Sequence, residues 1–86
     1  MKFEYRTHLS PEEVIERAET FYQEQTGLEV QERAANRLEL SGAIGVAKIS
    51  AQREHGHTSV LAETDRGVGL DVTDQTLRFL YTLPHI

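Results

Sequence analysis

The sequence lacks cysteine altogether. Disulfide bonds, thiolate metal sites and cysteine nucleophiles are therefore excluded, and the fold must be held together by packing. A chain without thiols fits a cytoplasmic protein, and we expect that location. The sequence also lacks an apolar run of the ~20 residues that a membrane-spanning helix needs, and its alternating start has no signal-peptide character.

Basic residues are scarce. Nine Lys and Arg stand against 14 Asp and Glu, which gives a formal net charge of −5. The basic residues are scattered, and nucleic-acid affinity depends on neutralising phosphates with Lys and Arg. We therefore expect neither a nucleic acid nor a membrane among the partners.

The length and composition are those of a small globular protein. A chain of 86 residues with 38% hydrophobic and 27% charged residues predicts one domain over residues 1–86. A domain of this size buries roughly 60–65% of its unfolded surface, which is enough to fold alone.

The strongest local pattern lies at the start of the chain. Residues 2–9 alternate between apolar and polar, which is typical of a strand with one face on a core. Ser10 can cap a helix, Pro11 suits its first position, and Glu13 can bond back to the cap. The apolar spacing that follows predicts a helix over residues 11–26.

The middle of the chain reads as strands joined by turns. Gly27 supplies the left-handed residue that ends the helix, and Asn36 can adopt positive φ in a turn. From the alternation we expect strands at residues 28–34, 37–41, 46–54 and 57–64, turns at 35–36, 55–56 and 65–67, and a break or β-bulge at 41–45.

The C-terminal segment can be read in two ways. A first turn of Thr73, Asp74 and Gln75 favours a helix that ends near Leu83, whereas the alternation of residues 77–83 also fits a strand. We favour the helix. It would be apolar over much of its surface, and we expect Phe79 to lie partly outside the core of the monomer.

These elements predict an α+β fold in two layers. An antiparallel sheet of about four to six strands would carry one helix after the first strand and a second helix at the C-terminus. The order, with Ser10-Pro11-Glu12-Glu13-Val14 opening the first helix, resembles the helix-grip superfamily of polyketide-cyclase and START-like proteins. It is also similar to the TATA-box-binding-protein-like folds.

The resemblance implies different properties for the two groups. A helix-grip relative would hold an apolar ligand inside a curled sheet, but those proteins are longer and have more strands. A nucleic-acid-binding relative would show clustered basic and intercalating residues on the open sheet face, and this sequence shows none. No functional residue is carried over from either family.

Candidate sites for chemistry are weak. His55 and His57 flank a glycine typical of a turn, and His8 and His85 have no evident relation to them, so we expect no metal site. The segment at 42–45 lacks the Lys and Ser/Thr of a phosphate loop. The acidic run of the first helix is typical of a solvated face. We therefore assign no catalytic, cofactor-binding or metal-binding residue.

Two functions remain, and an enzyme has no support beyond the presence of His and Glu side chains. The first is an interaction module that forms a homodimer through residues 72–86 or through strand edges, with another protein also open as a partner. The second is a small binder that holds an apolar ligand between the sheet and the C-terminal helix. The residues expected at the interface or ligand site are Ile44, Ile49, Leu61, Leu77, Phe79, Leu80 and Leu83.

Overall fold

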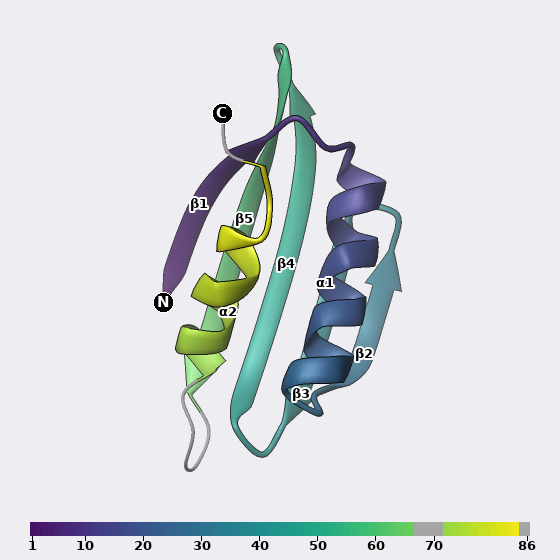
Figure 1. Ribbon diagram of the computed structural model, residues 1–86. Coiled ribbons are helices and arrows are strands. Elements are labelled where there is room, and N and C mark those ends of the chain that lie inside the picture. Colours follow the sequence, from purple (N-terminus) through teal and green to yellow (C-terminus); the bar gives the residue numbers. More distant parts are fainter. Residues whose placement is uncertain (67–71, 85–86) are drawn as a thin grey trace.

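The computed structural model describes residues 1–66 and 72–84 and shows an α+β fold of two layers. A five-stranded antiparallel sheet forms one layer, and two helices form the other (Figure 1). This confirms the expected class and the expected order of elements. The elements are β1 (Lys2–Thr7), α1 (Pro11–Gln25), β2 (Glu29–Ala34), β3 (Arg37–Gly42), β4 (Gly45–Glu54), β5 (His57–Arg66) and α2 (Val72–Tyr81).

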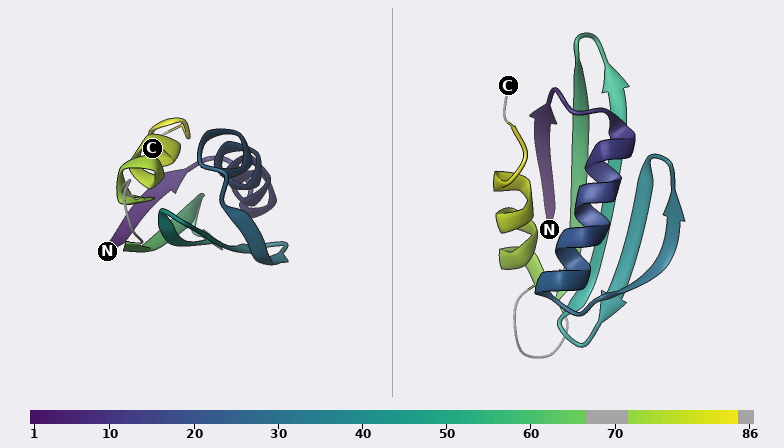
Figure 2. Two further views of the ribbon diagram at one scale, coloured as in Figure 1. Left: turned by 90° about the horizontal axis from the view of Figure 1, so that it is seen from below. Right: turned by 45° about the vertical axis from the view of Figure 1, so that its right-hand side comes forward.

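The strands are ordered β1-β5-β4-β3-β2 across the sheet. Strands β2 to β5 follow one another as hairpins, whereas β1 pairs with the last strand. The chain therefore leaves β1, crosses the sheet through α1 and enters β2 at the opposite edge (Figure 2). As a result, β1 and β2 are the two edge strands.

α1 begins with the expected cap at Ser10. The Ser10 hydroxyl accepts a hydrogen bond from the Glu13 backbone N–H at 3.3 Å, and Pro11 occupies the first turn. Gly27 ends the segment with φ of +71°. The face of α1 that packs on the sheet consists of Val14, Ile15, Ala18 and Tyr22, all fully buried.

The expected break at residues 41–45 and the expected turn at 35–36 are both found, but the β-bulge lies elsewhere. Residues 41–45 form a tight hairpin, because Gly42 pairs with Gly45 around a two-residue turn, and the bulge lies in β2 between Val30 and Glu32. Asn36 lies in the predicted turn without positive φ, because the positive φ values found among the described residues belong to glycines. The tight turn at Gly45 takes a φ of +133°, which only glycine adopts readily.

Strand β5 is longer than expected. It continues to Arg66, which pairs with Gly45 of β4, so Asp65 lies within the ladder and not in a turn. The rest of the predicted turn, Gly67, lies outside the described residues. The long β4–β5 hairpin lies inside the sheet, with β1 paired to β5 on one side and β3 paired to β4 on the other.

The C-terminal segment is a helix, and its phase differs from the expected one. Its buried residues are Val72, Thr76, Phe79 and Leu80, which lie on one face of the helix. The prediction that Phe79 lies partly outside the core is wrong, since its side chain is 0% exposed. The exposed aromatic is Tyr81, at 74%.

The core lies between the helices and one face of the sheet. In β3, β4 and β5 the buried residues alternate with more exposed ones, so the buried residues share a single face. The end-on view in Figure 2 shows both helices on this face and the other face left uncovered. The strand residues in the core are Leu38, Leu40, Ala47, Ile49, Ala51, Val60 and Ala62. No helix of the described residues is both long and apolar enough to cross a bilayer.

Candidate functional site

The edge formed by β1 is regular along its whole length. Its register with β5 runs without interruption from Lys2, opposite Glu63, to Thr7, opposite Thr58. The pairing extends one residue further, because the Met1 ammonium donates to the Thr64 carbonyl at 2.6 Å and Thr64 N–H donates to the Met1 carbonyl at 2.8 Å. Met1 and Thr64 are therefore a hydrogen-bonded pair of the ladder.

This pair determines which backbone groups face outward. In an antiparallel ladder, hydrogen-bonded pairs alternate with non-hydrogen-bonded pairs. Counting from Met1, the N–H and C=O groups of Phe3, Tyr5 and Thr7 point toward β5. The groups of Lys2, Glu4 and Arg6 therefore point away from it, toward the outer edge. Within the described residues β1 is the last strand on this side.

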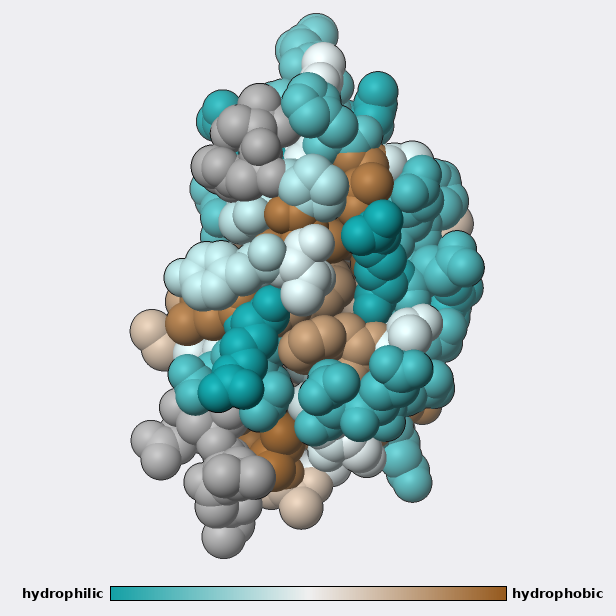
Figure 3. All heavy atoms as spheres, in the orientation of Figure 1, coloured by the Kyte–Doolittle hydropathy of each residue, from teal (hydrophilic) through white to brown (hydrophobic). Residues whose placement is uncertain are grey.

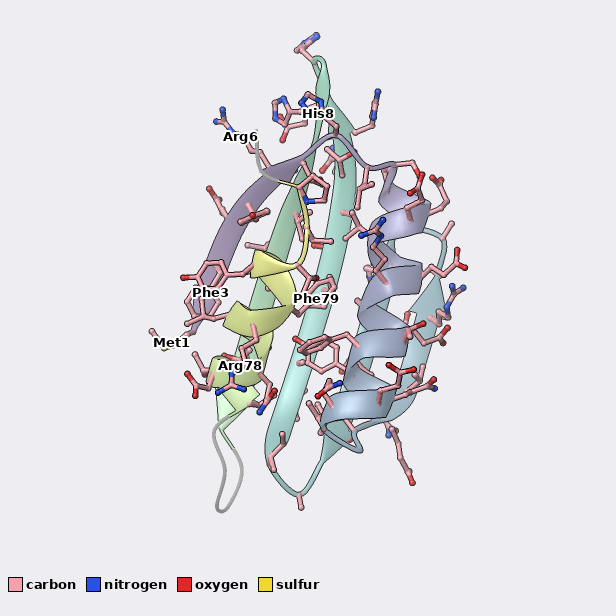
Figure 4. All side chains as sticks on the ribbon, viewed as in Figure 1. Met1, Phe3, Arg6, His8, Arg78 and Phe79 are labelled. Atoms are coloured by element: carbon pink, nitrogen blue, oxygen red, sulfur yellow. The ribbon has the colours of Figure 1, made fainter. Side chains whose placement is uncertain are left out.

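The side chains of β1 divide into two faces. Phe3 and Tyr5 are half-buried on the helix side, where the Tyr5 hydroxyl donates to the Leu83 carbonyl at 3.0 Å. Lys2, Glu4 and Arg6 are exposed on the open side. Figure 4 shows Phe3 near α2 and Arg6 extending away from the upper end of the strand. The edge thus combines an apolar side with an alternating row of charges.

The other edge, β2, is irregular, and two of its charged residues have ion-pair partners within the chain. The bulge leaves Gln31 without an opposite residue in β3, and the Gln31 amide donates to the Glu29 carbonyl at 3.4 Å. Arg33 contacts Glu19 of α1 at 3.2 Å, and Glu32 contacts Arg37 of β3 at 3.0 Å. A bulged, charged edge of this kind resists pairing with another strand.

Most of the apolar residues expected at an interface or ligand site belong to the core instead. Ile49, Phe79, Leu80 and Leu83 are buried in the core, with at most 3% exposure. Leu61 lies on the opposite face of the sheet from Ile49, because Leu61 pairs with Ser50 and Ile49 pairs with Ala62. Of the remaining two, Ile44 is half-buried at the β3–β4 turn and Leu77 is half-buried on α2.

An aromatic cluster fills the space between the helices and the sheet. Phe79 of α2, labelled in Figure 4, lies on the side of α2 that faces α1. Its ring centroid lies 5.6 Å from that of Phe21 and 5.9 Å from that of Tyr22, both in α1. The hydroxyls of Tyr22 and Thr76 form a hydrogen bond that joins the two helices. Burial raises the pKa of Tyr22 to about 12, and the hydrogen bond to Thr76 opposes this shift.

A groove of about 460 Å³ runs along α1 beside the end of α2. Figure 3 shows hydrophobic residues reaching the surface between the two helices, flanked by hydrophilic ones. Carboxylates on a solvated helix face do not by themselves make a site, and we assign none here. The residues that line the groove are Glu13, Glu16, Arg17, Thr20, Phe21, Glu24 and Thr82.

The open face of the sheet interleaves charges of both signs. One row across neighbouring strands reads Lys2, Glu63, Lys48 and Glu39. Because opposite charges alternate, the described part of this face presents no continuous positive surface of the kind that binds nucleic-acid phosphates.

His55 and His57 lie at the β4–β5 turn, as the sequence indicated. His55 and His57 flank Gly56, whose φ is +76°, and His57 Nδ1 lies 3.0 Å from the His55 carbonyl oxygen. Within residues 1–66 and 72–84 no three His, Asp or Glu side chains come close enough to hold a metal ion. His85 lies outside the described residues.

Sequence reasoning pointed to strand edges in general but did not single out β1. The alternation of residues 2–9 indicated a strand, yet its place in the sheet depends on pairing with β5, about 60 residues away. The available signal was the alternation of charge at Lys2, Glu4 and Arg6, which becomes informative once these residues are known to line an edge.

No known protein-family model matches this sequence, and no curated protein matches it at a significant level. The two edges of the sheet therefore provide the feature of the fold that bears on function.

Proposed function

We propose that this protein is a non-enzymatic interaction module that forms a homodimer by pairing the β1 edges of two copies. The observation that carries the proposal is the contrast between a regular β1 edge and a bulged β2 edge with internal ion pairs. A regular edge is a template for another strand, and proteins usually blunt such an edge when it must stay free.

A second copy is the occupant that this edge suits. Two β1 strands related by a two-fold axis would join the two sheets and keep the helices of both copies on one side. The side chains of the edge are self-complementary, since Lys2, Glu4 and Arg6 alternate in sign on one face. On the other face, Phe3 and Tyr5 are half-buried in the monomer and would gain apolar neighbours.

The ligand-binding alternative has less support. We propose that the likeness to helix-grip and TATA-box-binding-protein-like folds is one of architecture, because the order of elements agrees while Phe21, Tyr22 and Phe79 fill the interior. The burial of Phe79 also weakens residues 72–86 as the interface. The lack of cysteine supports a cytoplasmic location.

Self-association is tested by native mass spectrometry and sedimentation velocity of untagged protein over a range of concentrations. We expect a dimer without added mass. The Glu4→Pro variant removes an outward-facing N–H and should be monomeric while its circular dichroism spectrum stays unchanged. The matched control is Gln31→Pro at the bulge of the other edge, which should remain dimeric.

A wild-type protein that stays monomeric at every concentration would overturn the proposal. A dimer that persists in Glu4→Pro would place the interface elsewhere. A monomer that carries a bound compound of a few hundred daltons would instead support the ligand-binding alternative.

A further inference from the structure

The orientation of two paired β1 strands is restricted by the faces of the sheet. Residues directly opposite each other in an antiparallel pair point to the same face. The helix sides of both copies form one layer only if each helix-side residue of β1, Phe3, Tyr5 or Thr7, lies opposite another helix-side residue. Three registers meet this condition with good overlap, and they place Phe3, Glu4 or Tyr5 on the two-fold axis.

The register with Glu4 on the axis has the most backbone contact but the wrong charges. It places Glu4 opposite Glu4 of the second copy, and Lys2 opposite Arg6 of the second copy. Like charges directly opposite each other destabilise a strand pair. The alternating signs of this strand therefore disfavour its longest overlap.

The register with Phe3 on the axis pairs opposite charges, but one of them already has an oppositely charged neighbour. It pairs residues 1–5 of each copy and places Lys2 opposite Glu4 of the second copy. Lys2 already lies opposite Glu63 in its own sheet, so this register adds little to its surroundings. The charge of Arg6 would be left outside the paired region.

The register with Tyr5 on the axis pairs opposite charges, and neither charge already faces a charged residue in its own sheet. It pairs residues 3–7 of each copy and places Glu4 opposite Arg6 of the second copy twice, by symmetry. Within their own sheet Glu4 lies opposite Leu61 and Arg6 lies opposite Ser59, both uncharged. The second copy thus supplies the charged cross-strand neighbours that β5 does not.

We propose that the two copies pair antiparallel with the two-fold axis at Tyr5, so that Glu4 and Arg6 of each copy lie opposite Arg6 and Glu4 of the other. The inference rests on the homodimer proposed above. Four backbone hydrogen bonds then join the strands, two for each Glu4–Arg6 pair. On the helix side Tyr5 meets Tyr5 of the second copy.

The absence of native cysteine makes the register directly measurable. Single variants Phe3→Cys, Glu4→Cys and Tyr5→Cys are oxidised as dimers and analysed on non-reducing gels. Only residues on the axis bring their Cα atoms within about 7 Å of each other, the limit for a disulfide. We expect efficient cross-linking of Tyr5→Cys, and cross-linking of Phe3→Cys or Glu4→Cys instead would overturn the register.

Charge reversal gives a second test that leaves the half-buried Tyr5 intact. Arg6→Glu places like charges opposite each other twice and should weaken the dimer by roughly tenfold or more. The double variant Glu4→Arg/Arg6→Glu restores opposite charges and should recover the wild-type dissociation constant. Mixing Glu4→Arg with Arg6→Glu should produce a heterodimer in preference to either homodimer.

The outcome for Arg6→Glu separates the registers. With Phe3 on the axis this variant leaves the dissociation constant unchanged, and with Glu4 on the axis it tightens the dimer because Lys2 then faces a carboxylate. Either result overturns the proposed register and leaves the β1 homodimer standing. A protein that remains monomeric in every assay overturns the homodimer and the register together.

Discussion

The two edge strands of this sheet have six residues each and carry charged side chains, yet they differ in regularity. β1 keeps one continuous register with β5, whereas β2 is interrupted by a bulge at Gln31. If β1 pairs with a second copy as proposed, charge alone does not close an edge. The backbone register, and the partners that each charge finds within the chain, decide whether another strand can pair there.

The partners of the charges make the same distinction. In β2, Arg33 reaches Glu19 on the covering helix, and Glu32 reaches Arg37 on the next strand. In β1, Glu4 and Arg6 lie opposite uncharged residues of β5. Charges of the first kind tie an edge to its own molecule, whereas charges of the second kind can select a partner.

α2 is packed into the core through Phe79, and the variant Phe79→Ala tests how much this packing stabilises the fold. Removing this fully buried ring should cost about 3–5 kcal/mol of the free energy of unfolding, measured by urea denaturation. The matched control is Tyr81→Ala on the exposed side of α2, which should stay within about 0.5 kcal/mol. A loss below 1 kcal/mol for Phe79→Ala would contradict the observed packing.

The Tyr22–Thr76 hydrogen bond joins α1 to α2. The stability of the protein at alkaline pH tests how deeply the Tyr22 hydroxyl is buried. Because the pKa of Tyr22 rises from 10.0 to about 12 on folding, both states are protonated below pH 10 and the stability there is unaffected. Above pH 10 the unfolded state loses its proton first. Stability should therefore fall by up to about 3 kcal/mol as the pH rises from 10 to 12.

Urea denaturation at several pH values measures this fall. In Tyr22→Phe the alkaline loss should be much smaller, although the variant is less stable at neutral pH because Thr76 loses its partner. The control is Tyr81→Phe, which removes a hydroxyl from an exposed ring. An unchanged alkaline loss in Tyr22→Phe would show that another group is responsible.

Deletion of Gln31 is the most direct way to remove the difference between the edges, and its expected effect on stability is the smallest. Without this residue β2 should pair with β3 in one continuous register, and the free energy of unfolding should change by no more than about 1 kcal/mol. The chain would then have two regular edges. We expect species larger than a dimer in sedimentation velocity, and a protein that remains strictly dimeric would show that the bulge does not protect β2.

The local elements were predictable because their signals are local. Ser10 and Pro11 mark the start of α1 by hydrogen bonding and backbone geometry that involve only neighbouring residues. The alternation of Ala47, Ile49 and Ala51 gave the buried face of β4 directly. Such patterns fix the class of the fold without fixing how the strands are ordered.

The features that were missed depend on distant contacts. The phase of α2 is set by Val72 and Thr76, and Thr76 bonds to a tyrosine 54 residues earlier, so the sequence could not show that Phe79 faces inward. The bulge at Gln31 lacks a glycine that would have marked it. The β1 edge could be recognised only after β1 was found beside β5, because its sequence alone is that of any half-buried strand.

The most direct test of the β1 edge is amide hydrogen exchange, followed residue by residue by NMR at two protein concentrations. The N–H groups of Glu4 and Arg6 point to the outer edge, so they exchange rapidly in a monomer and are protected when a second β1 strand pairs there. The account predicts protection of both amides that increases with concentration and disappears in Arg6→Glu at low concentration. Rapid exchange of Glu4 and Arg6 in a protein that is demonstrably dimeric would contradict it.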